Sequence, residues 1–142
     1  YAPISDWSPI FAIPSVTFIN LQYTDFLADL TEIKNEFGVT VHNFDDLDHY
    51  NDLEDVAALC AALDIVVSTK ITVPLISAAV GTITKLANWR QSPWNNILLN
   101  PVGPLVDIFE KNTSEPWHEV FSAIAEDIMK FSIIANSTLG DS

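Results

Sequence analysis

The residues of this chain best suited to binding an anion follow a predicted strand and open a predicted helix. The strand is the β-branched run of residues 65–67, and the polar turn and helix start that follow contribute Ser68, Thr69, Lys70, Thr72 and Val73. The free amides of a helix N-terminus and the helix dipole favour negative charge there, and a lysine adds a cation. The segment therefore predicts a phosphate-binding turn, although Lys70 is also compatible with a solvated turn lysine.

A second polar turn follows the first predicted strand, residues 15–21. It contains Gln22, Tyr23 and Asp25. Because the carboxyl ends of parallel strands lie at one edge of a sheet, we expect Gln22 and Tyr23 to line the same crevice as the turn after residue 67. The alternative interpretation is a polar turn that only caps the following helix.

Two further groups could contact the nucleoside part of a ligand. Asp45 and Asp46 lie in an acidic loop, DDLDHY, after the second predicted strand, and could hold a ribose hydroxyl or could simply be solvated. Trp89, which follows the fourth predicted strand, could stack on a nucleobase or could cover the core.

The elements that must position these residues alternate along the chain. Strands are predicted at residues 15–21, 39–44, 65–67, 82–88 and 105–109, and helices at 24–38, 51–64, 72–80 and 114–134. Short connections between strands and helices imply parallel strands. The predicted fold class is therefore α/β, a three-layer Rossmann-like parallel sheet with helices on both faces. Residues 1–14 are expected to be an irregular lead-in, and residues 135–142 a frayed tail.

Particular residues set the expected helix boundaries. Asn51, with Glu54 three positions later, predicts a capping box, and Leu53 is expected on the apolar stripe of the same helix. Ser114 is expected to cap the last helix. Gly38 and Gly81 are placed to end two of the helices.

Composition limits the functions that need to be considered. The chain has 142 residues, which fits one domain, and a formal net charge of −13, which argues against nucleic acid and anionic membranes as partners. A single cysteine, Cys60, and three separated histidines indicate no disulfide and no metal site. No membrane span or signal peptide is visible, so a cytoplasmic location is expected. The start at Tyr1 suggests a piece of a longer protein.

Common nucleotide-binding and hydrolase motifs are missing. The first turn, residues 22–25, contains no glycine, so the G-x-G-x-x-G fingerprint of nicotinamide and flavin enzymes is absent. The P-loop and the G-x-S-x-G elbow are also absent. No cofactor is therefore expected.

The chain resembles the C-terminal, donor-binding half of a GT-B glycosyltransferase. It is most similar to the heptosyltransferase-like group (glycosyltransferase family 9), of the kind fused to tetratricopeptide repeats in bacteria. The matching pieces cover roughly residues 7–130: FINLQY at 18–23 with Asp25, NDL at 51–53 with Asp55, AL at 58–59, ALDIVVS at 62–68, Gly81, SPW at 92–94 and Trp117.

The resemblance implies a nucleoside-diphosphate sugar beyond the strand ends, with its diphosphate near Thr72. Lys70 and Leu75 stand where family members commonly carry an acid and a histidine, so those donor contacts cannot be carried over. The catalytic base of such enzymes usually lies on the acceptor-binding half. This chain alone is thus expected to bind donor without catalysing transfer, next to an N-terminal acceptor domain or tetratricopeptide repeats.

A hypothesis of another class is a degenerate, non-catalytic module. It would dock a repeat domain or a partner chain through the Trp-rich loop that contains Trp94. Loss of donor contacts at Lys70 and Leu75 is compatible with this second function.

Overall fold

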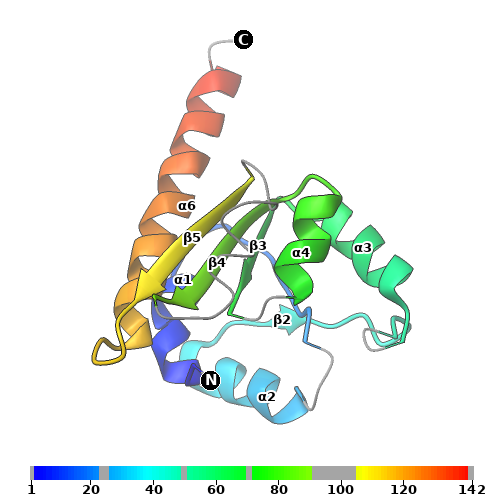
Figure 1. Ribbon diagram of the computed structural model, residues 1–142, viewed down its shortest axis with the longest axis horizontal. Coiled ribbons are helices and arrows are strands. Elements are labelled where there is room, and N and C mark those ends of the chain that lie inside the picture. The colour runs from blue at the N-terminus through cyan, green and yellow to red at the C-terminus, as the bar shows by residue number, and fades with distance from the viewer. Residues whose placement is uncertain (1, 23–25, 49–50, 70–71, 91–104, 141–142) are drawn as a thin grey trace.

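The computed structural model of the protein describes residues 2–22, 26–48, 51–69, 72–90 and 105–140, with only the backbone for 131–140. Labels follow Figure 1. The elements, in chain order, are the 3-10 helix η1 (Ile4–Trp7), α1 (Ser8–Phe11), β1 (Phe18–Ile19), α2 (Leu27–Phe37), β2 (Val41–His42), α3 (Leu53–Ala62), β3 (Ile65–Ser68), α4 (Thr72–Ala79), β4 (Ile83–Trp89), β5 (Val106–Lys111) and α6 (Trp117–Gly140).

The strands form two parallel sheets, one of β1 and β2 and one in the order β3-β4-β5. The α/β class and the parallel pairing are thus confirmed. The sheet is interrupted between β1 and β3, and β1 is much shorter than predicted. Ser15 supplies a reason, because its φ of 59° lies in the left-handed region and is incompatible with an extended strand.

Helices cover both faces of the three-stranded sheet (Figure 1). On one face α1 and α6 pack against Ala87 of β4, with Phe121 and Ile124 at the centre of the contact. On the other face α3 and α4 pack on Val66 of β3, and α4 also packs near Leu86 of β4. Side chains alternate between the faces along each strand, so this pattern produces the predicted three layers.

Both chain ends differ from the sequence-based expectation. The predicted irregular lead-in is wrong for residues 4–11, which form η1 and α1. Trp7 anchors this segment by stacking on Phe121 of α6 at 4.2 Å between ring centroids. The predicted frayed tail is wrong for residues 135–140, which continue α6, because no proline or internal glycine interrupts it before Gly140. In the described ranges, no helix has the length and apolar character needed to cross a membrane.

The cap of α3 is shifted by one residue from the predicted capping box. Asp52, rather than Asn51, accepts a hydrogen bond from the Asp55 backbone N–H at 3.0 Å. Asn51 instead donates to the carboxylate of Asp48 through its backbone and side chain. Leu53 is therefore the first helical residue, and it is 60% exposed rather than part of the buried stripe.

The start of α6 also differs from the prediction. The helix begins at Trp117, after Pro116, so Ser114 does not cap it. The preceding turn is closed by Glu115, whose carboxylate accepts hydrogen bonds from the backbone and side-chain N–H groups of Asn112, both at 2.8 Å. These bonds lower the pKa of Glu115 from its ordinary value. Thr24, expected to cap α2, lies outside the described residues.

The two predicted helix-ending glycines are confirmed. Gly38 ends α2 with φ of 66°, and Gly81 follows α4 with φ of 83°. A Cβ at either position would meet no atom within 4 Å, so only backbone strain opposes substitution.

We therefore expect Gly81→Ala to lower the free energy of unfolding by about 1–2 kcal/mol, because alanine disfavours the left-handed region. Gly81→Asn should cost less, since asparagine tolerates this conformation. Urea unfolding of both variants tests the difference. Equal losses for alanine and asparagine would contradict backbone strain as the cause.

Candidate functional site

A cavity of about 940 Å³ lies between β1 and β3, where the sheet is interrupted. Residues 15–22 of the β1 segment and residues 62–69 of the β3 segment line two of its sides. Its interior is mostly apolar, and its polar lining includes Asn20, Gln22, Ser68 and Thr69 at the carboxyl ends of the two strands. The cavity therefore has a polar region at the edge of the sheet where the sequence predicted a site.

The structure brings several predicted phosphate-binding residues together. Gln22, Ser68, Thr69 and Val73 all line the cavity. Thr72 is the first residue of α4 and is exposed next to Val73. Tyr23 and Lys70, which were also predicted to bind the donor, lie outside the described residues. Binding by any of these residues stays a prediction.

β1 and β3 both border the cavity, and each has one backbone edge that pairs with no described strand. The Asn20 N–H donates to the His42 carbonyl at 2.8 Å, so its neighbours Ile19 and Leu21 direct their backbone groups away from β2. In the three-stranded sheet, the Thr84 N–H of β4 donates to the carbonyl of Leu105, the residue before β5, at 2.9 Å. The backbone groups of Thr84 are therefore directed toward β5. Because Val66 lies opposite Thr84 in the β3–β4 register, Val66 bonds to β4 and the backbone groups of the next residue, Val67, are directed away from β4. Within the described residues no ladder joins β1 to β3.

We therefore expect the amides of Ile19, Leu21 and Val67 to exchange with solvent faster than the amide of Leu86, which lies in the middle strand of the three-stranded sheet. Hydrogen–deuterium exchange followed by NMR measures this directly. Slow exchange of all three amides, comparable to Leu86, would show that β1 and β3 are paired in solution.

Asn20 and Asn43 link the carboxyl ends of β1 and β2 to the acidic loop. Asn20 is only 5% exposed. Its side-chain Oδ1 accepts from the Gln22 N–H at 3.1 Å, and its Nδ2 donates to Asn43 Oδ1 at 3.0 Å. Asn43 Nδ2 in turn donates to Asp45 Oδ1 at 2.6 Å. Asp45 is thereby connected to the cavity edge. The sequence prediction missed both asparagines, although Asn20 interrupts an apolar run.

The predicted nucleoside contacts do not line the cavity. Trp89 is on the α6 side of the sheet, 6.4 Å from the Trp117 ring, and the Lys111 ammonium lies 5.8 Å from its centroid. It does not line the cavity. Asp45 and Asp46 are both exposed, and neither is among the cavity residues.

The cavity carries negative rather than positive charge in the described part of the chain. Asp29 and Asp64 line it, whereas no described lysine or arginine does. An anionic group would therefore depend on backbone amides and the start of α4. Neutral, hydroxyl-rich groups suit the remaining polar lining.

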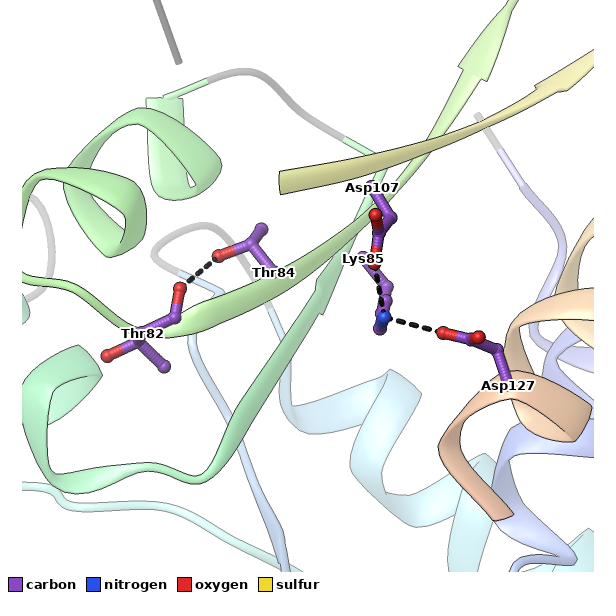
Figure 2. A network of polar contacts seen from close by, with 5 residues as sticks. All are labelled: Thr82, Thr84, Lys85, Asp107 and Asp127. Atoms are coloured by element: carbon purple, nitrogen blue, oxygen red, sulfur yellow. Dashed lines mark hydrogen bonds and ion pairs between the residues drawn. The ribbon is translucent and has the colours of Figure 1, made fainter. Parts of the chain in front are cut away.

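A separate charged cluster joins β4, β5 and α6 away from this cavity. The Lys85 ammonium lies 2.5 Å from carboxylate oxygens of both Asp107 and Asp127. Figure 2 shows both contacts. Burial alone lowers the pKa of Lys85, but the hydrogen bonds and attraction of the two carboxylates outweigh it and raise that pKa above its ordinary value. On the same strand, Thr84 Oγ1 donates to the Thr82 carbonyl at 3.0 Å (Figure 2). These groups already have partners, so we interpret them as structural.

Comparison with known proteins gives one informative similarity. Protein FlbA of Caulobacter vibrioides is 30% identical over 141 residues, which covers 93% of this chain. The chain spans only 22% of the length of that protein. No family model matches the chain, and no solved structure matches it significantly.

Proposed function

We propose that the chain binds a nucleoside-diphosphate sugar and acts as the donor-binding domain of a glycosyltransferase. The observation that carries this proposal is the cavity between β1 and β3, with Gln22, Ser68 and Thr69 at its polar edge. The resemblance of the sequence to the donor half of GT-B enzymes is the reason for proposing this class of ligand. A cytoplasmic location belongs to the same proposal.

The position of the cavity supports a nucleotide ligand. β1 pairs with β2 and β3 pairs with β4, so a continuous sheet formed across the cavity would have the strand order 2-1-3-4-5. In parallel α/β sheets of this order, nucleotides bind beyond the carboxyl ends of strands 1 and 3, where the direction of winding reverses. The cavity lies between these same two strands.

The start of α4 supports a diphosphate in particular. Thr72 and Val73 open an eight-residue helix directly after the turn that follows β3. The first amides of a helix have no partner within the helix, and the dipole places partial positive charge there. Both features would favour the diphosphate in a region where the described cavity lining has no cation.

Calorimetric titration with ADP-glucose, GDP-mannose and UDP-glucose tests the proposal. Thr69→Trp places a large side chain at the polar edge of the cavity, and we expect it to weaken binding at least tenfold. Val80→Trp is the matched control, because Val80 is exposed just after the end of α4 opposite Thr72 and does not line the cavity. Both variants should keep the thermal midpoint within a few degrees of the parent chain.

Two results would contradict donor binding. The first is no heat of binding with any of the three sugars at millimolar concentration. The second is equal weakening by Thr69→Trp and Val80→Trp. In either case the rival function, a non-catalytic docking module, becomes the better interpretation of the chain.

A further inference from the structure

The segments of β1 and β3 contribute side chains to the same two layers of the protein, although the strands belong to separate sheets. Phe18 of β1 packs against the core on the α1 and α6 face, as do Ile65 and Val67 of β3. On the α3 and α4 face, Leu21 packs against the cluster that contains Val66. Side chains alternate between faces along a strand, so each face of β1 continues the matching face of β3. Pairing of the two strands therefore requires neither strand to rotate about its axis.

The backbone of each strand is also directed so that the two edges can pair. The groups of Ile19 and Leu21 are directed away from β2, and those of Val67 away from β4. In a parallel pair, a residue directed toward the partner strand lies opposite one directed away from it. Ile19 would therefore lie opposite a residue that bonds to β4, and Val66 is such a residue. Because Val66 is also on the face of Leu21, and hence of Ile19, the backbone and side-chain criteria agree.

Polarity distinguishes the alignment of Ile19 with Val66 from its neighbours. A shift by two residues would place Ile19 opposite Asp64 or Ser68 instead. An apolar side chain opposite a carboxylate or a hydroxyl loses the packing that stabilises neighbouring strands. The alignment with Val66 is therefore the register that we expect if β1 and β3 pair.

We propose that the nucleotide sugar closes the sheet by pairing β1 with β3 in this register. Closure places Gln22 opposite Thr69, about 5 Å apart, the usual spacing of neighbouring strands. A ligand that contacts both polar residues therefore binds the closed state better and shifts the population toward it. Closure also fills the apolar cavity and provides hydrogen-bond partners for the backbone of Ile19, Leu21 and Val67. The inference rests on the proposed donor site and adds a conformational step to it.

Amide exchange followed by NMR, without ligand and with ADP-glucose, GDP-mannose or UDP-glucose, tests the closure. For a nucleotide sugar that binds, we expect the amides of Ile19, Leu21 and Val67 to exchange at least about tenfold more slowly at saturation. The amides of Asn20 and Val66 are the controls, because both already bond within their own sheets. Their exchange should change less than about twofold.

A pair of cysteines tests the register. In a Cys60→Ala background, Leu21→Cys with Ser68→Cys places two thiols opposite each other in the closed sheet, where the Cα separation of about 5 Å suits a disulfide. Leu21→Cys with Thr69→Cys is the matched control, because Thr69 would face the other layer. With ligand present, we expect the first pair to oxidise about tenfold or more faster than the second.

Each part of the inference can fail separately. Ligand binding without slower exchange of the three amides would overturn closure and leave donor binding intact. Slow exchange of all three amides in the ligand-free chain would overturn the role of the ligand, since the sheet would then already be closed. Equal oxidation of the two cysteine pairs would overturn the register. Absence of binding by all three nucleotide sugars would overturn both this inference and the proposed function.

Discussion

Phe121→Ala is expected to lower the free energy of unfolding by about 3–5 kcal/mol, the usual cost of removing a buried phenylalanine side chain. Phe121 is fully buried on α6 and stacks against Trp7 and Trp117 with centroid distances of 4.2 and 6.2 Å. These contacts attach η1, α1 and the start of α6 to the sheet. A cavity at Phe121 would weaken all of them, and urea unfolding measures the loss.

Met129→Ala provides the control on the same helix. Met129 is 38% exposed and is not part of the core cluster, so its truncation should cost less than about 1 kcal/mol. A loss for Phe121→Ala that is no larger than the loss for Met129→Ala would mean that the N-terminal segment does not pack on α6 in solution.

Lys85→Met is expected to lower the free energy of unfolding by about 1–3 kcal/mol. The Lys85 side chain is almost fully buried, and its removal leaves Asp107 and Asp127 facing each other without a cation. Both carboxylates are partly exposed, so solvent reduces the penalty below that of a fully buried pair. Arg90→Met is the control, since the exposed Arg90 pairs with Glu110 at 3.5 Å and should contribute less than about 1 kcal/mol.

The stabilisation by Lys85 should also depend on pH. Its pKa in the folded state is raised above the ordinary value of 10.5, so folding favours the protonated form. The contribution is fully present below pH 10.5 and is lost as the pH rises through the folded-state pKa. We therefore expect the stability difference between the parent chain and Lys85→Met to be constant from pH 7 to pH 10 and to shrink above that range. A difference that grows in alkali would contradict the assigned ion pair.

The α/β class and most element positions could be predicted because local signals agreed with tertiary packing. The β-branched run of residues 65–67 became β3, and Gly38 and Gly81 ended their helices as expected. The candidate site was partly predictable for the same reason. Strand ends of a parallel sheet share an edge, so Gln22, Ser68 and Thr69 line one cavity.

The errors arose where competing local interactions had similar sequence signals. Asn51 and Asp52 are both good caps, and the choice between them depends on Asp48, which binds Asn51. The late start of β1 depends on the backbone conformation of Ser15, which no pattern in the sequence predicts. The Asn20–Asn43 contact joins residues 23 positions apart, so periodicity and spacing alone do not reveal it.

Backbone amide NMR during titration with ADP-glucose, GDP-mannose and UDP-glucose tests the donor site most directly. For at least one of these ligands, we predict saturable shifts at Gln22, Ser68, Thr69 and Val73. The amides of Lys111 and Glu115, on the far side of the sheet, should not move. No shifts at millimolar ligand, or shifts centred on Trp89 and Lys111 instead, would contradict a nucleotide-sugar site between β1 and β3.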